Sequence, residues 1–135
     1  MKNKFSLWLV LMCLCLTVQA GVIENLLPKP QQIIAKGGNF RVGNVKLTTP
    51  VWQEEWKNFI AEAGGAVVDK SAREIVVKMV PQIEGAELNQ EEAYRLVVSG
   101  KSIQVEATTE KGVYWAMQTL RQLEQQKGRY QACEI

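Results

Sequence analysis

The sequence contains no histidine, a single aspartate, Asp69, and only three cysteines among 135 residues. Without an imidazole the chain cannot build a Ser-His or Cys-His nucleophilic pair, or a mixed Cys/His zinc site. Glutamate supplies the other 13 of the 14 acidic side chains. Paired carboxylates can act as general acid and base without histidine, so each glutamate has to be judged by its surroundings.

Residues 1–20 have the pattern of an export signal. Lys2 and Lys4 form a positive start, residues 5–16 are almost wholly apolar, and Val18 and Ala20 are small residues before a cleavage position. This pattern predicts cleavage after Ala20 and a periplasmic or extracellular location. The apolar run is shorter than the ~20 residues that a membrane-spanning helix needs, so we expect no membrane attachment after cleavage.

Removing residues 1–20 also removes Lys2 and Lys4, which leaves 14 basic against 14 acidic side chains. A formally neutral chain gives no reason to expect a nucleic acid or an anionic membrane as partner. Cys133 is then the only cysteine, so an internal disulfide is excluded. A chain of this length can bury one core, and we expect residues 21–135 to form one small domain.

Apolar periodicity in residues 21–135 predicts six strands and two helices. The predicted strands are 31–34, 40–47, 74–80, 92–98, 103–107 and 129–135, and the predicted helices are 50–63 and 110–127. Thr49 and Thr109 are the expected N-caps, while Gly64 and Gly128 follow the helix ends. The order predicts an α+β, two-layer fold, in which two amphipathic helices cover one face of a mixed, mostly antiparallel sheet.

One aromatic residue does not lie on the apolar face of its predicted helix. In the first helix, the aromatic spacing that starts at Trp52 and Trp56 indicates a buried face. In the second helix, the apolar stripe that starts at Val113 indicates another, but Trp115 lies about 200° around the helix from Val113. Trp115 therefore points away from the sheet. Its ring is either washed by solvent or in contact with something that the chain does not contain.

None of the polar clusters has the setting of an active site. Glu84, Glu87, Glu91 and Glu92 fit no calcium-loop pattern and are interpreted as a solvated connection between strands. Ser99 and Ser102 lie at a hairpin tip with no histidine or lysine partner in sequence. We therefore predict no catalytic, cofactor-binding or metal-binding residue and no cofactor.

Three segments together resemble a known family. They are Leu27–Ile33, the strand Glu92–Val98 and the run Ile103–Leu123, which contains Ala-x-x-x-x-Gly-x-x-x-Ala-x-Gln-Thr-Leu-x-Gln-Leu. They resemble the N-terminal domain of exported bacterial β-N-acetylhexosaminidases over nearly the whole of residues 21–135. The resemblance implies an accessory α+β domain that precedes a catalytic (β/α)8 barrel.

By the same resemblance, the complete enzyme removes terminal β-linked N-acetylhexosamine from glycans with retention. The acetamido oxygen of the sugar acts as nucleophile, while an Asp-Glu pair of the barrel orients it and supplies the general acid. Asp69 is followed by Lys70, so this pair has no counterpart here. We expect the chain to be a fragment that ends at Ile135, before the barrel, and to be inactive alone.

The resemblance also implies a partner for the outer face of the second helix. We expect Trp115, Gln118 and Gln122 to dock on the barrel of the complete enzyme, whose substrate is a glycan. Two alternatives stay open. One is the equivalent module of another glycosidase, such as an α-glucuronidase or a hyaluronidase-like N-acetylglucosaminidase. The other is a free-standing glycan-binding or interaction domain, although the sequence shows no cluster of exposed aromatic residues.

Overall fold

The computed structural model describes residues 22–135, so the predicted export signal lies outside the described residues. These residues form the short 3-10 turn η1 (Val22–Asn25), eight strands and two helices. The strands are β1 (Ile34–Arg41), β2 (Asn44–Thr48), β3 (Ala66–Val67), β4 (Glu74–Met79), β5 (Tyr94–Val98), β6 (Ser102–Ala107), β7 (Glu124–Gln126) and β8 (Arg129–Glu134). The helices are α2 (Gln53–Glu62) and α3 (Glu110–Leu123). Neither helix is long and apolar enough to cross a membrane.

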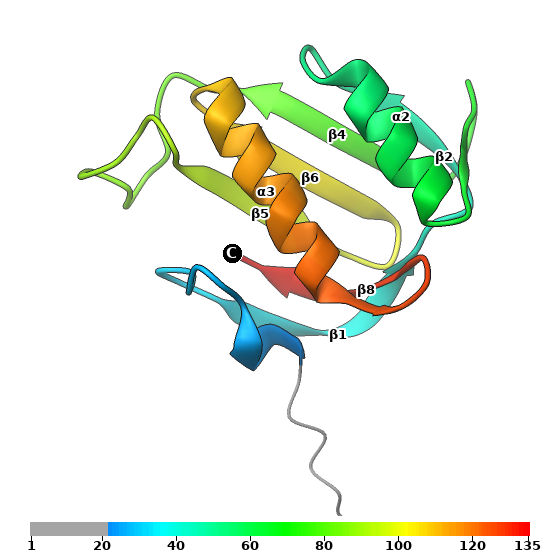
Figure 1. Ribbon diagram of the computed structural model, residues 1–135, viewed down its shortest axis with the longest axis horizontal. Helices are drawn as coiled ribbons and strands as arrows, with labels where there is room; N and C mark the ends of the chain where they lie inside the picture. Colours follow the sequence, from blue (N-terminus) through cyan, green and yellow to red (C-terminus); the bar gives the residue numbers. More distant parts are fainter. Residues whose placement is uncertain (1–21) are drawn as a thin grey trace, which may run out of the picture.

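The strands form one sheet in the order β1-β8-β5-β6-β4-β2-β3, with β7 beside β8. Strands β2, β3, β4 and β6 pair in parallel, and the other four pairings are antiparallel. Both helices lie against the same face of this sheet (Figure 1). The predicted α+β, two-layer class with a mixed sheet is therefore confirmed.

The core lies between the helices and the sheet, and alternation along the strands builds it. In β6, Ile103 and Val105 are fully buried while Gln104 is exposed, because successive side chains of a strand point to opposite faces. The predicted stripe of α3, which begins at Val113, is buried throughout. In α2, Trp56 and Phe59 are buried and their rings meet edge to face. Within residues 22–135, no helix lies on the opposite face of the sheet.

The start of α2 differs from the prediction. The helix begins at Gln53, and its N-cap is Trp52, whose φ of 58° lies in the left-handed region. The hydroxyl of Thr49 is not a cap, because it donates to the carbonyl of Val51 and closes a turn around Pro50. This turn keeps the backbone out of the helix until Gln53. Trp52 is half-buried and packs at the edge of the core.

The end of α3 and the bounds of several strands also differ from the prediction. The helix ends at Leu123 rather than at Lys127, because residues 124–126 become extended and pair with β8 as β7. The carboxylate of Glu124 accepts a hydrogen bond from the Gly128 amide, and Gly128 has the positive φ of a tight turn. Strand β1 shares only Ile34 with the predicted strand 31–34, and the predicted strand 40–47 is divided between β1 and β2. Strand β5 starts at Tyr94 rather than at Glu92.

Candidate functional site

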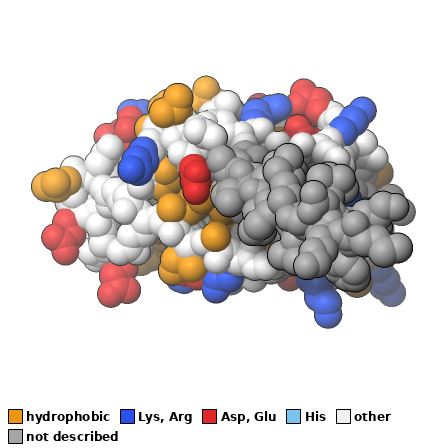
Figure 2. All heavy atoms as spheres, turned by 90° about the horizontal axis from the view of Figure 1, so that it is seen from below, with side chains coloured by type: hydrophobic (Ala, Val, Ile, Leu, Met, Phe, Trp, Pro, Cys, Tyr) orange, Lys and Arg blue, Asp and Glu red, His pale blue; other side chains and the backbone are white. Residues whose placement is uncertain are grey.

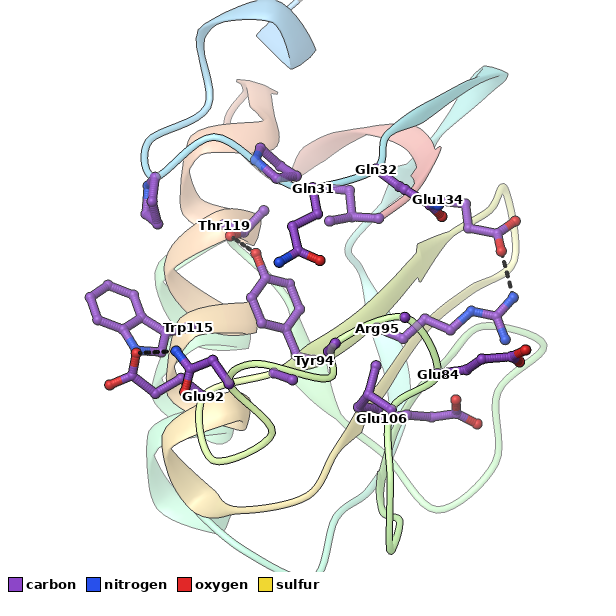
Figure 3. A pocket seen from close by; sticks show the side chains of 18 of the residues that line it. Gln31, Gln32, Glu84, Glu92, Tyr94, Arg95, Glu106, Trp115, Thr119 and Glu134 are labelled. Atoms are coloured by element: carbon purple, nitrogen blue, oxygen red, sulfur yellow. Dashed lines mark hydrogen bonds and ion pairs between the residues drawn. The ribbon is translucent and has the colours of Figure 1, made fainter.

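A concavity of about 1170 Å³ opens between the N-terminal segment, the loop before β5 and one side of α3. Residues 28–34 form one rim, and residues 82–93 form the other. Tyr94, Glu106 and Glu134 project into it from β5, β6 and β8, and Trp115 and Thr119 line it from α3 (Figure 3). The surface brings together segments that are far apart in sequence.

The helical wall is held by a hydrogen bond between α3 and β5. The hydroxyls of Tyr94 and Thr119 lie 2.6 Å apart. Burial is the main cause that raises the pKa of the Tyr94 phenol, so the phenol stays protonated and can donate this bond. Trp115 lies one turn before Thr119 and is half-buried rather than fully exposed. Its ring contacts that of Tyr114 edge to face at 5.3 Å between centroids.

The opposite wall is ionic. Glu134 of β8 accepts a hydrogen bond from Arg95 of β5, and Lys36 of β1 lies 3.7 Å from the same carboxylate. The hydrogen bond from Arg95 lowers the pKa of Glu134, and the same bond raises the pKa of Arg95. A general acid of a glycosidase needs a carboxyl whose pKa is raised. Glu134 has the opposite shift, so it is suited to an ion pair and not to proton transfer.

The loop before β5 is organised by one amide side chain. Gln90 donates from Nε2 to the carbonyls of Ile83 and Ala86, at 2.7 and 3.0 Å, and accepts from the Ile83 amide at 2.9 Å. The hydroxyls of Thr108 and Thr109 donate to the carbonyls of Gln90 and Glu91. Thr109 therefore ties the loop to α3 instead of capping the helix, although it occupies the N-cap position.

The four glutamates of this loop are exposed, as the sequence predicts for a solvated connection. Glu91 binds Lys111 at 3.0 Å, and Glu92 accepts from Asn89 at 3.2 Å. Within residues 22–135 no three acidic, cysteine or histidine side chains gather closely enough to share a metal ion. The loop thus has the contacts of a structural connection.

Two serine hydroxyls and one cysteine thiol outside this loop are hydrogen-bonded or buried. The hydroxyls of Ser99 and Ser102 lie 3.1 Å apart and close the β5–β6 hairpin. Cys133 is fully buried, and burial raises its pKa to about 11. A reactive cysteine needs a lowered pKa, so this thiol is inert at neutral pH.

Sequence reasoning missed Gln90 and assigned Gln122 a different contact. Gln90 gave no signal, because its partners are loop carbonyls. Gln122 donates from Nε2 to the Leu27 carbonyl at 2.6 Å and accepts from the Leu27 amide at 2.8 Å. The predicted outer face of α3 included Gln122, but its amide is satisfied within the chain. The spacing from Trp115 to Thr119 and Gln122 was the available signal, because positions i, i+4 and i+7 share one side of a helix.

Comparison with known proteins gives the family. Residues 24–135 match the model of "Glycosyl hydrolase family 20, domain 2", and no curated protein matches the chain. The chain therefore belongs to glycosyl hydrolase family 20 as its domain 2, which confirms the predicted resemblance. This domain is non-catalytic, in agreement with the absence of an Asp-Glu pair.

Solved structures agree with this assignment. The β-N-acetylhexosaminidase from Bacteroides fragilis aligns with a TM-score of 0.60 at 22% identity, over 82% of this chain and 24% of its own. The exo β-N-acetylglucosaminidase from Vibrio harveyi aligns with a TM-score of 0.60 at 25% identity, over 84% and 19%. CpGH84B shares the fold, with a TM-score of 0.63 at 18% identity over 82% and 22%. The chain thus spans about a quarter or less of the length of these structures.

Proposed function

We propose that these residues are the non-catalytic N-terminal domain of an exported β-N-acetylhexosaminidase. The observation that carries the proposal is the match of residues 24–135 to domain 2 of glycosyl hydrolase family 20. The similar structures named as N-acetylhexosaminidases are at least four times longer than the aligned part, which leaves room for a catalytic domain. The complete enzyme would hydrolyse terminal β-linked N-acetylhexosamine residues by the substrate-assisted retaining mechanism.

In this proposal, the domain supports the catalytic barrel through the outer face of α3. Tyr114 is 45% exposed, and Trp115 and Gln118 beside it are half-buried. Leu27 next to α3 is 75% exposed. Aromatic rings at a surface are typical of an interface core. Here they lie between two charged side chains of α3, Lys111 and Arg121, which are 60% and 44% exposed. Figure 2 shows further hydrophobic side chains at the surface on the side of β1.

The role proposed for Gln122 is narrower than the sequence suggested. Its amide binds the Leu27 backbone on both sides, so it holds the N-terminal segment against α3. That contact holds the segment in which Leu26 is buried in the core and Leu27 is exposed next to α3. Trp115 and Gln118 remain available for direct contact with the barrel.

Two experiments test the function. Reading the gene beyond codon 135 should give a (β/α)8 barrel with an Asp-Glu pair, and the complete enzyme should release a chromophore from an aryl β-N-acetylglucosaminide. The 135-residue chain should show no turnover of the same substrate. A downstream sequence without that pair, or turnover by the purified chain alone, would refute the proposal.

Export is tested separately. Mass spectrometry of the protein recovered from the periplasm or medium should give Gly21 as the first residue. Retention of residues 1–20 in a protein found only in the cytoplasm would contradict the predicted signal.

A further inference from the structure

Three of the five arginines of the chain lie together at one end of the sheet. Arg41 of β1 and Arg129 of β8 are directly opposite each other in the antiparallel register. Arg73, just before β4, donates from Nη1 to the Arg41 carbonyl at 3.0 Å. The same Nη1 is the closest atom to the space above Gly43, so the Arg73 side chain lies across the β1–β2 connection. We call Arg41, Arg73 and Arg129 the arginine cluster.

The arginine cluster has no acidic partner within residues 22–135. Arg95 and Arg121 each bind a carboxylate, Glu134 and Glu62 respectively, whereas none of the three clustered arginines forms an ion pair there. Like charges directly opposite in an antiparallel pair are destabilising. The chain therefore concentrates uncompensated positive charge at this place.

Neither nearby acidic residue forms an ion pair with a clustered arginine. Glu124 accepts a hydrogen bond from the Gly128 amide at 2.8 Å. Glu74 follows Arg73, and its register partners are Lys46 of β2 and Ser102 of β6. Lys101 flanks the cluster, because its carbonyl accepts from the Glu74 amide. The surroundings thus add positive charge and little that would neutralise the guanidinium groups.

The arginine cluster is also distant from the proposed docking surface. The β1–β8 ladder begins with Ile34 opposite Glu134, beside the concavity, and ends with Arg41 opposite Arg129. In Figure 1 this second end lies next to the turn that follows α3, away from the C-terminus. A partner bound there would not compete with a barrel docked on Trp115 and Gln118.

We propose that the arginine cluster binds the acidic groups of an anionic polysaccharide. Guanidinium groups bind carboxylate and sulfate oxygens through two parallel hydrogen bonds, and a polymer can present several such groups at once. The choice of a polysaccharide, rather than another polyanion, rests on the proposed function of the complete enzyme in glycan hydrolysis. Such a contact would keep the enzyme close to acidic glycan material while its catalytic domain acts elsewhere.

The direct test is calorimetric titration of the purified chain with polygalacturonate, dextran sulfate and neutral dextran. At least one acidic polymer should bind saturably, and the double variant Arg41→Gln/Arg129→Gln should weaken that binding by about tenfold. The control Lys57→Gln/Lys111→Gln removes two charges elsewhere and should bind as the unchanged chain does. Equal weakening by both double variants, absence of binding, equal binding of neutral dextran, or equally tight binding to phosphatidylglycerol vesicles would overturn the proposal.

Thermal unfolding supplies a second readout and shows whether the variants fold. Because Arg41 and Arg129 repel each other, Arg129→Gln should leave the Tm unchanged or slightly higher. The acidic polymer that binds should raise the Tm of the unchanged chain and not that of Arg41→Gln/Arg129→Gln. An equal rise in Tm for the unchanged chain and the double variant would show that the polymer does not bind at the arginine cluster. These measurements use no hydrolysis, so their failure is distinct from a failure of the proposed enzyme activity.

Discussion

The two helices cover the same sheet face, yet their outer surfaces differ. The outer face of α2 is charged and exposed, with Glu54, Glu55, Lys57 and Glu62 on ten residues. The outer face of α3 carries Tyr114, Trp115 and Gln118. Both inner faces are equally buried, so core formation does not explain the contrast. The difference is that aromatic rings occupy the middle of the α3 face, between Lys111 and Arg121. It supports the proposal that α3, rather than α2, contacts the barrel.

The largest expected effect concerns the inner side of α3, where Gly112 lies against the backbone just before β5. A Cβ at Gly112 would lie 2.3 Å from the Ala93 carbonyl oxygen and 2.9 Å from the Ala107 Cβ. Gly112→Ala should therefore lower the free energy of unfolding by about 3 kcal/mol, because backbone has to move. Urea denaturation of the chain measures this change.

Gly37→Ala is the matched control, because nothing lies within 4 Å of its added Cβ. We expect its effect to stay below about 0.5 kcal/mol. If both substitutions had similar effects, the close approach of α3 to the sheet would be wrong.

The next effect concerns the N-terminal segment, which α3 holds and α2 does not. Gln122→Ala removes two hydrogen bonds to the Leu27 backbone and should cost about 1–2 kcal/mol. Hydrogen exchange should show faster exchange of the Leu27 amide. Gln53→Ala, an exposed position at the start of α2, is the control and should leave this amide unchanged. If the Leu27 amide exchanged as slowly in Gln122→Ala as in the unchanged chain, Gln122 would not hold the N-terminal segment.

A smaller effect is expected where the helices meet. Arg121 of α3 binds Glu62 of α2 at 2.8 Å, and its guanidinium carbon lies 5.4 Å from the centre of the Phe59 ring. Both charged groups are about half exposed, so Arg121→Gln should cost less than about 1 kcal/mol. The loss should shrink at high salt, as thermal unfolding at two salt concentrations can show. A salt-independent loss would assign the effect to packing instead.

The smallest effect is a pH dependence on β8. Arg95 lowers the pKa of Glu134 below its ordinary value of 4.5. A lowered folded pKa gives stability that is complete above pH 4.5 and is lost as the pH falls through the folded pKa. Glu134→Gln should therefore lose less Tm than the unchanged chain when the pH falls below 4.5. If the Tm of Glu134→Gln fell more steeply with pH than that of the unchanged chain, the ion pair with Arg95 would not stabilise the fold.

Local signals were enough for much of the fold. Alternation predicted β6, turn residues predicted the Ser99–Ser102 hairpin, and helical spacing predicted the buried stripe from Val113 to Leu123. Each of these signals depends on neighbours in sequence. The parallel pairing of β2 with β4 and the two-residue strand β3 gave no such signal, because their partners lie far along the chain. Trp52 at positive φ was missed for another reason. Its conformation follows from the turn at Thr49, which competes with helix formation.

The candidate site was less predictable than the fold. The sequence showed that Trp115 lies outside the apolar face of its helix. Its partial burial depends on the concavity lined by residues 28–34 and 82–95, which are two other segments of the chain. The contacts of Gln122 with Leu27 span 95 residues, and the arginine cluster depends on the β1–β8 register. The periodicity of a sequence carries no information on contacts between segments that are far apart in the chain. These contacts depend on how the strands and helices pack together.

The most direct test of the contrast between the helices introduces the same charge on each outer face. Gln118→Lys on α3 and Asn58→Lys on α2 both add a lysine at a polar position. In the 135-residue chain, both should change the Tm by a similar, small amount. In the complete enzyme, Gln118→Lys should lower the Tm of the domain while Asn58→Lys should not, because only α3 would contact the barrel. Equal Tm values for the two variants in the complete enzyme would contradict the account.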